Sequence, residues 1–192
     1  KFLSEVLKNK IVVRVSEEPF EINGMLYDRG TLVITRKGNE SMGQRFDKVL
    51  RKLSKKYNTN LGSVSTGLVT KGKDFGSSTM RVVNAPKVAV LSGEDVSSYS
   101  FGEVWHYFEQ QIGYPLSVYD ASTIQTLPLD NIDVLIMPDG SYNSFVNENS
   151  PSEKMKEETG ADVLLINQPP EELLDWVRSG GRLIAIGSAM EK

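Results

Sequence analysis

The sequence contains no cysteine and only one histidine, His106. Without cysteine, the chain has no disulfides, no thiolate metal ligands and no thiol nucleophile. A catalytic zinc ion is held by about three protein ligands, usually including two or more histidines, so a single histidine argues against a zinc site within this chain. No apolar run approaches the ~20 residues that a membrane-spanning helix requires, and no membrane span is expected.

An excess of charge of one sign is also lacking. The 22 lysines and arginines nearly balance the 25 aspartates and glutamates, and the formal net charge is −3. No basic stripe is evident that would neutralise a phosphate backbone, so we expect no nucleic-acid partner. The length of 192 residues suits one domain or two small ones, and the first residue, Lys1, indicates a fragment or a processed form of a larger protein.

The N-terminal part of the chain carries signals for strands and a hairpin. Residues 11–15 and 31–35 are rich in β-branched side chains, which predicts a strand at each. Asn23-Gly24 interrupts the alternating stretch between them, and this dipeptide is a strong signal for a hairpin turn. The pattern predicts a small β-meander over residues 10–36.

A helix is expected after the meander. Ser41 and Gln44 have the spacing of a capping box, and apolar residues then recur at helical spacing. Asn58 suits a left-handed helix stop. Residues 81–83 are a candidate short strand.

The hydrophobic pattern changes at Pro86, where we place the boundary between a small α+β segment (1–85) and an α/β domain (86–192). Near-continuous apolar runs beyond it are typical of strands that are buried on both faces. They predict strands at 87–91, 116–119, 134–137 and 183–186, with 161–166 as a further candidate. Helices are expected between them, one opening with a capping box at Ser100 and Glu103 and one with Pro170 in its first position.

Alternating strands and helices imply a parallel sheet with helices on both faces. Such sheets bind ligands beyond the carboxyl ends of their strands. The candidate ligand crevice therefore consists of Gly93, Glu94, Asp139, Gly140, Ser141, Gly187 and Ser188.

Catalysis at this crevice meets several objections. Ser188 follows a strand, but the surrounding residues do not satisfy the G-x-S-x-G pattern of a nucleophile elbow, and only His106 could supply a histidine base. Glu94 and Asp139 are better interpreted as solvated loop carboxylates, since no partner is visible that would shift their pKa values. A degenerate hydrolase and a small-ligand-binding domain remain as alternatives.

Aromatic residues are concentrated around the first helix of the α/β domain. Their number exceeds what one buried helix face needs, which favours a domain or partner interface there. The cluster comprises Tyr99, Phe101, Trp105, Tyr107, Phe108 and Tyr114.

Two strand ends resemble the class I glutamine amidotransferases. VLIMPDG at 134–140 resembles the strand that ends in Pro-Gly-Gly in that family, and RLIAIGSA at 182–189 resembles the strand entering its nucleophile elbow. The resemblance implies a flavodoxin-like, amidotransferase-like fold. In this alignment Gly187 occupies the position of the nucleophilic cysteine and Asp139 replaces a glycine near the oxyanion hole, so the resemblance implies no amidotransferase chemistry.

Longer stretches resemble the C-terminal region of large bacterial zinc carboxypeptidases of the carboxypeptidase A type, in which an amidotransferase-like domain follows the peptidase domain. These stretches are 20–39, 100–115 and 173–190. The family's H-x-x-E zinc motif has no counterpart here, so zinc is expected only in a separate peptidase domain and no cofactor in this chain. The resemblance implies a non-catalytic accessory domain of a secreted or periplasmic protein. Its expected partners are its own peptidase domain and a peptide or glycan.

Overall fold

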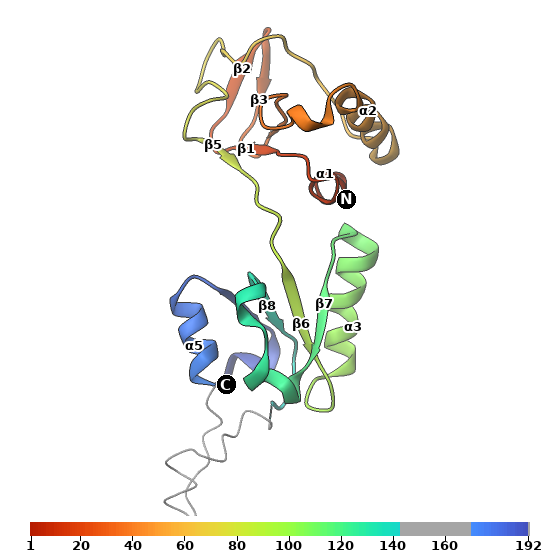
Figure 1. Ribbon diagram of the computed structural model, residues 1–192, viewed down its shortest axis with the longest axis vertical. Helices are drawn as coiled ribbons and strands as arrows, with labels where there is room; N and C mark the ends of the chain where they lie inside the picture. Colours follow the sequence, from red (N-terminus) through yellow and green to blue (C-terminus); the bar gives the residue numbers. More distant parts are fainter. Residues whose placement is uncertain (143–169, 192) are drawn as a thin grey trace, which may run out of the picture. The chain divides into compact units, whose positions relative to one another are not determined.

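The computed structural model describes residues 1–142 and 170–191. The chain divides into two compact units, Lys1–Ala85 and Pro86–Lys192 (Figure 1). The first is an α+β arrangement with short antiparallel strands, and the second contains a parallel sheet flanked by helices. The candidate strand at 161–166 lies outside the described residues.

Two separate antiparallel sheets form in the first unit. One has the order β4-β1-β5, with β1 at Arg14–Ser16, β4 at Leu32–Val33 and β5 at Met80–Val82. The other is a hairpin of β2 (Phe20–Ile22) and β3 (Met25–Tyr27). The expected single meander over 10–36 is therefore wrong, because β1 pairs with β4 and the distant β5 instead of with β2. The hairpin turn itself is confirmed, since Asn23 and Gly24 adopt φ angles of 54° and 75°.

Helix α2 (Arg45–Tyr57) packs on α1 (Phe2–Lys8) in the same unit. Its apolar face joins a core made by Val6, Ile11, Val13, Phe46, Leu50 and Leu53. The predicted capping box is wrong: Ser41 lies in a preceding 3-10 helix (Glu40–Met42), and Gln44 occupies the cap position without a side-chain hydrogen bond. The helix ends at Asn58 in the left-handed conformation, as predicted.

Asn39 joins the loop before α2 to the chain segment before β1. Its side chain is buried, accepts a hydrogen bond from the Val12 amide at 2.8 Å and donates to the carbonyl oxygens of Val12 and Thr35 at 2.9 and 2.8 Å. This one amide therefore satisfies three backbone groups that belong to no strand ladder.

In the described residues of the second unit, the strands form a four-stranded parallel sheet of order β7-β6-β8-β9. The strands are β6 (Val88–Ser92), β7 (Ser117–Asp120), β8 (Val134–Met137) and β9 (Arg182–Ala185), each within one or two residues of its predicted range. The two central strands are the most deeply buried because helices and turns cover both of their faces. The predicted parallel sheet with flanking helices is thus confirmed.

Helices α3 (Ser98–His106) and α5 (Glu171–Arg178) cover opposite faces of this sheet. Phe101 and Val104 of α3 pack on Val88, Val90 and Ile136, whereas Leu173 and Trp176 of α5 pack with the alternate residues of the same strands. A π-helical turn, Tyr107–Ile112, extends α3 to Gly113, which adopts a left-handed conformation.

Two predicted helix starts in this unit are wrong. Ser97, not Ser100, caps α3, and its hydroxyl accepts a hydrogen bond from the Ser100 amide at 3.4 Å. Pro170 occupies the cap of α5 instead of the first helical position. None of the helices in the described parts of the chain has the length and apolar character needed to cross a bilayer.

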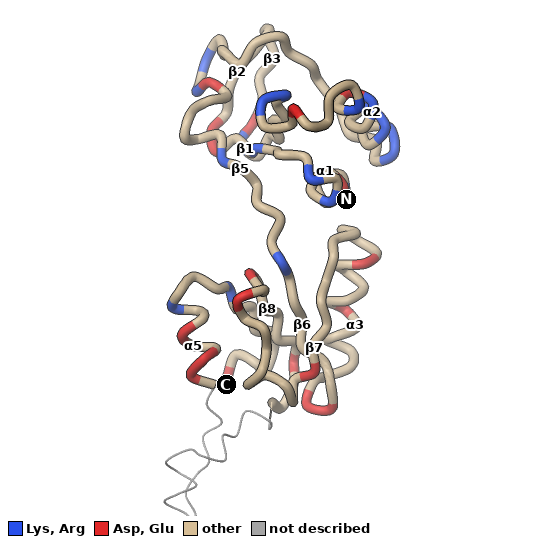
Figure 2. Tube along the Cα trace, viewed as in Figure 1, with Lys and Arg blue, Asp and Glu red and all other residues tan. Residues whose placement is uncertain are grey.

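Charge is divided between the two units. Residues 1–85 contain 16 lysines and arginines against 8 aspartates and glutamates, a net of +8, and residues 86–192 contain 6 against 17, a net of −11. Figure 2 shows basic residues along α2 and acidic residues on the second unit. The expectation that the chain has no basic stripe is therefore wrong, because the exposed residues of α2 form one.

Candidate functional site

The ends of β8 and β9 are joined by a hydrogen-bond cluster around Asp139. Its carboxylate Oδ1 accepts hydrogen bonds from the backbone amide of Ser188 at 2.8 Å and from the Ser188 hydroxyl at 2.6 Å. The same hydroxyl lies 2.9 Å from the Gly140 carbonyl oxygen and accepts from the Gly140 amide at 3.3 Å. Because a hydroxyl has one proton, Ser188 donates to either Asp139 or Gly140 at any moment, and both acceptors are supplied by the protein itself.

The N-terminus of α3 fixes the backbone of Asp139. The backbone amide of Asp139 donates to the Ser100 hydroxyl at 3.0 Å, and the Asp139 carbonyl oxygen accepts from the Ser97 amide at 2.8 Å. The hydrogen bonds from Ser188 stabilise the ionised carboxylate and lower the pKa of Asp139 below its ordinary value. The carboxylate is thus charged near neutral pH and is a weak base.

The loop after β6 is bonded directly to the loop after β8. The Ser141 amide donates to the Asp95 carbonyl oxygen at 2.8 Å, and the Ser141 hydroxyl donates to Asp95 Oδ1 at 3.2 Å. Gly140 forms a bridge with Val96, and a Cβ atom at Gly140 would lie 2.3 Å from the Asp95 carbonyl oxygen. Only glycine allows this approach, so the glycine serves the contact between the two loops.

Two further strand-end glycines lie against carboxylates. A Cβ atom at Gly187, which has a φ of 62°, would lie 2.6 Å from Asp139 Oδ1. Gly93, with a φ of 117°, would bring a Cβ atom to 2.9 Å from Asp120 Oδ1. Asp120 accepts from the Ser122 hydroxyl and amide at 2.7 and 2.9 Å, and these hydrogen bonds lower its pKa.

The structure thus joins four of the seven predicted crevice residues, Asp139, Gly140, Gly187 and Ser188, in one cluster. Gly93 lies against Asp120 and Ser141 bonds Asp95, whereas Glu94 is an exposed loop carboxylate. Sequence analysis missed Asp120, although an aspartate two residues before a serine and directly after a strand is a cap signal. It also missed Tyr142, a fully buried residue with a φ of 47° whose hydroxyl donates to the Pro138 carbonyl oxygen at 2.6 Å. Burial raises the pKa of the Tyr142 hydroxyl well above its ordinary value.

Carboxylates collect at this end of the sheet. The segments that follow the four strands, 93–97, 120–122, 138–142 and 186–191, contain no lysine or arginine. Together with α5, which begins at the same end of the sheet (Figure 1), they form a surface that we term the acidic edge. The acidic edge comprises Glu94, Asp95, Asp120, Asp139, Glu172 and Glu191. Such a surface repels phosphate groups, which disfavours a nucleotide or flavin phosphate in this crevice.

The described residues place few groups that could bind a metal ion or act as a base near the crevice. Within residues 1–142 and 170–191, no three histidine, aspartate or glutamate side chains are grouped so that they could hold a metal ion. His106 is exposed and ends α3, whereas Ser97 and Ser100, which contact Asp139, begin it. The arrangement mainly links one strand end to the next.

An apolar groove of about 300 Å³ lies on the α3 face of the sheet and reaches the end of β9 at Ile186. Ile136, Ile184 and Ile186 line its floor, and Val104 and Phe108 of the α3 segment line its side. Ile184 is 48% exposed, although parallel strands are normally covered on both faces. The aromatic cluster divides accordingly: Phe101 and Phe108 pack on the sheet, and Tyr99, Trp105 and Tyr107 are exposed.

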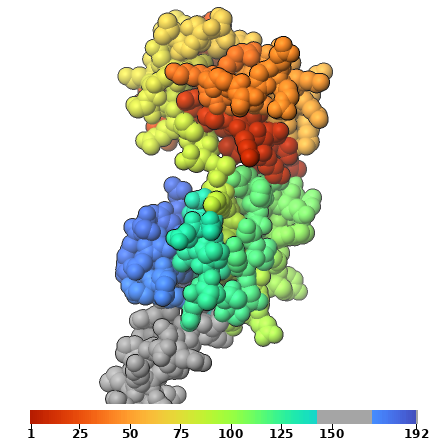
Figure 3. Space-filling model, in the orientation of Figure 1, coloured from red at the N-terminus to blue at the C-terminus, as the bar shows by residue number. Residues whose placement is uncertain are grey.

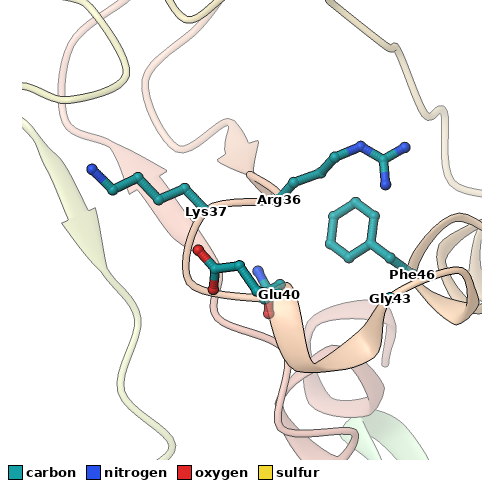
Figure 4. Close-up of a pocket in the computed structure, with 6 residues that line it drawn as sticks. Arg36, Lys37, Glu40, Gly43 and Phe46 are labelled. Atoms are coloured by element: carbon teal, nitrogen blue, oxygen red, sulfur yellow. The ribbon is translucent and has the colours of Figure 1, made fainter.

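A second cavity, of about 460 Å³, lies in the first unit beside the N-terminus of α2 (Figure 4). The Arg36 guanidinium lies 5.2 Å from the centre of the Phe46 ring and is bonded to Asp47, and the Glu40 carboxylate accepts from the Gly38 amide. The charges of Arg36 and Glu40 are therefore already matched by α2 and by the loop, and Lys37 is the remaining charged side chain that lines the cavity.

The chain matches no protein-family model, no curated protein and no solved structure. The functional inference therefore depends on the residues and their geometry together with the resemblance noted in the sequence.

Proposed function

We propose that this chain is a non-catalytic accessory module of a zinc carboxypeptidase-like protein, which supports the peptidase domain or binds a substrate or partner. One observation carries the proposal: the candidate crevice is occupied by the protein's own hydrogen bonds. Ser188 bonds Asp139 and Gly140, and Ser141 bonds Asp95, so the groups that could act on a substrate hold strand ends together.

The rival hydrolase needs a serine that loses its proton to a base. The nearest carboxylate to the Ser188 hydroxyl is Asp139, whose lowered pKa makes it a poor proton acceptor. No imidazole is placed between them, as a serine nucleophile normally requires. The geometry therefore favours a structural role for Ser188.

The finer fold assignment is part of the same proposal. Numbered along the described parts of the chain, the strands of the sheet have the order 2-1-3-4, which is how the flavodoxin-like order 2-1-3-4-5 begins. This order supports the flavodoxin-like, amidotransferase-like fold that the resemblance implies. On this proposal zinc belongs to a separate peptidase domain, and the whole protein is secreted or periplasmic.

An accessory module needs a surface for contact with a second domain or partner. The apolar groove beside β9 offers one, because Ile184 and Ile186 expose apolar area that water does not favour. A peptide or glycan bound at the strand ends remains the alternative ligand on this proposal.

The test compares this chain with the longer carboxypeptidase-like protein on peptides that have free C-termini, with and without added zinc. We expect cleavage only by the longer protein, and a change in its rate or stability when this chain is supplied in trans to its peptidase domain. Cleavage by this chain alone, abolished by a chelator, would contradict the non-catalytic reading.

A pair of serine variants tests the hydrolase alternative separately. Ser188→Ala removes the hydroxyl at the strand ends, and Ser98→Ala removes an exposed hydroxyl in the first turn of α3 as the matched control. Hydrolysis that Ser188→Ala abolishes while the variant keeps the wild-type unfolding transition, and that Ser98→Ala leaves intact, would indicate a nucleophilic Ser188 and overturn the proposal.

A further inference from the structure

Helix α2 presents a continuous basic stripe. At about 100° per residue, its six exposed basic residues fall within an arc of about 140° on the helix circumference. They are Arg45, Lys48, Arg51, Lys52, Lys55 and Lys56. The opposite arc holds Phe46, Leu50 and Leu53, which are buried in the core of the first unit. Figure 3 shows the orange atoms of this segment on the surface of the unit.

These cations are not neutralised by their neighbours. Asp47 is the only acidic residue on α2, and its carboxylate binds Arg36 at 2.7 Å. Among the described residues, no ion pair involves any of the six basic residues of the stripe. The stripe therefore offers its charge to an outside partner.

The chemistry of that partner is restricted by the rest of the molecule. Insertion into a membrane requires an exposed apolar helix face, and the apolar face of α2 is buried. A nucleic acid attracted to the stripe would be repelled by the charge of the second unit of the same chain, whose net charge is −11. An acidic protein surface avoids both problems, and the chain itself contains one in the acidic edge.

We propose that the basic stripe of one copy docks on the acidic edge of a second copy. The proposal does not need the accessory function proposed above, because it depends on the charge of the two surfaces and not on a peptidase domain. It does share the strand ends with the candidate crevice, since Glu94 and Asp139 belong to the acidic edge. The two surfaces differ, so the contact is head-to-tail, and a third copy can join in the same way unless the ring closes.

Such a contact should depend strongly on salt. Charges on an exposed helix interact over about 30 Å at 0.01 M ionic strength and over only about 8 Å at 0.15 M. In sedimentation velocity, we expect species heavier than the 21.3 kDa monomer at low salt and the monomer alone once salt is raised. A wild-type chain that stays monomeric at low salt would overturn the proposal, as would a salt-dependent change of shape without a change of mass.

Charge reversal on the stripe tests its location. Lys48→Glu, Lys52→Glu and Lys55→Glu together should weaken association by at least about tenfold, because like charges would then face each other. The matched control, Lys10→Glu with Arg29→Glu and Lys73→Glu, changes the net charge equally at exposed positions outside α2. An equal loss of association in the control would show that only net charge matters and would contradict the proposal.

A charge swap identifies the occupant. Glu94→Lys, Glu172→Lys and Glu191→Lys reverse exposed residues of the acidic edge, and this variant should not self-associate. Mixed with the stripe variant, it should restore a complex with the salt dependence of the wild type. Failure of the mixture, or binding of duplex DNA by the stripe while copies do not associate, would show a different partner.

Discussion

The two units of the chain reach a folded state by different means. In the second unit the central strands β6 and β8 bury apolar side chains completely, with Ala89, Val90 and Leu135 all 0% exposed. The strands of the first unit are two or three residues long, and its two clusters hold six and four buried residues, whereas one cluster of the second unit holds twelve. The parallel sheet is thus held mainly by apolar packing, and the first unit depends more on individual polar contacts.

The units also differ in charge, and the difference has a spatial pattern. The net of +8 in the first unit is concentrated on one helix, and acidic residues of the second collect at the strand ends. The same strand ends hold the candidate crevice, whose bonds are internal. The two units therefore carry the two oppositely charged surfaces whose contact we propose.

The largest expected effect comes from the core of the parallel sheet. Leu135→Ala should lower the free energy of unfolding of the second unit by about 2–5 kcal/mol, because it leaves a cavity in a fully buried strand. Both tryptophans, Trp105 and Trp176, lie in this unit, so tryptophan fluorescence in a denaturant titration reports on it specifically.

Leu183→Ala is the matched control for that core variant. Leu183 is the register partner of Leu135 on β9 but is 37% exposed, so its truncation should cost clearly less. Equal costs at the two positions would contradict the inference that burial between the two faces stabilises this unit.

The first unit should be most sensitive at Asn39. Asn39→Ala leaves the Val12 amide and two carbonyl oxygens without partners and should cost about 1–3 kcal/mol. Amide hydrogen exchange should rise around Val12 and Thr35, while the tryptophan transition of the second unit stays in place. Asn60→Ala, at an exposed position, should change neither the amide exchange nor the tryptophan transition. A shift of the tryptophan transition by Asn39→Ala would contradict the inference that the two units unfold separately.

Sequence patterns predicted the second unit better than the first for a physical reason. Continuous apolar runs identify parallel strands locally, and the turn at Asn23-Gly24 is likewise a local signal. The pairing of β1 with β5 joins residues more than sixty positions apart, at Arg14 and Val82, and no local pattern specifies that partner. The expected meander failed for this reason.

The candidate site was predictable in position but not in its bonding. Parallel topology alone placed Asp139, Gly140 and Ser188 at one edge. The serine that caps α3 was not predictable, since both Ser97 and Ser100 fit the local spacing. In the structure the Ser100 hydroxyl accepts a hydrogen bond from the Asp139 amide, and Ser97 caps the helix. The basic stripe on α2 was missed because the basic residues of this segment are interspersed with apolar residues in the linear sequence, and the two kinds separate onto opposite faces only when the helix is wound.

The smallest expected effect concerns the strand-end carboxylate. The folded-state pKa of Asp139 lies below its ordinary value of 3.8, so its ionised form stabilises the fold above that pH and the contribution is lost as the pH falls through the lowered pKa. Asp139→Asn should therefore flatten the decline in stability below about pH 4, measured by tryptophan fluorescence. Asp130→Asn, an exposed position outside the cluster, should keep the wild-type decline. Matching acid profiles for Asp139→Asn and the wild type would mean that the bonds to Ser188 do not stabilise the folded second unit, and the crevice would then be open to a ligand.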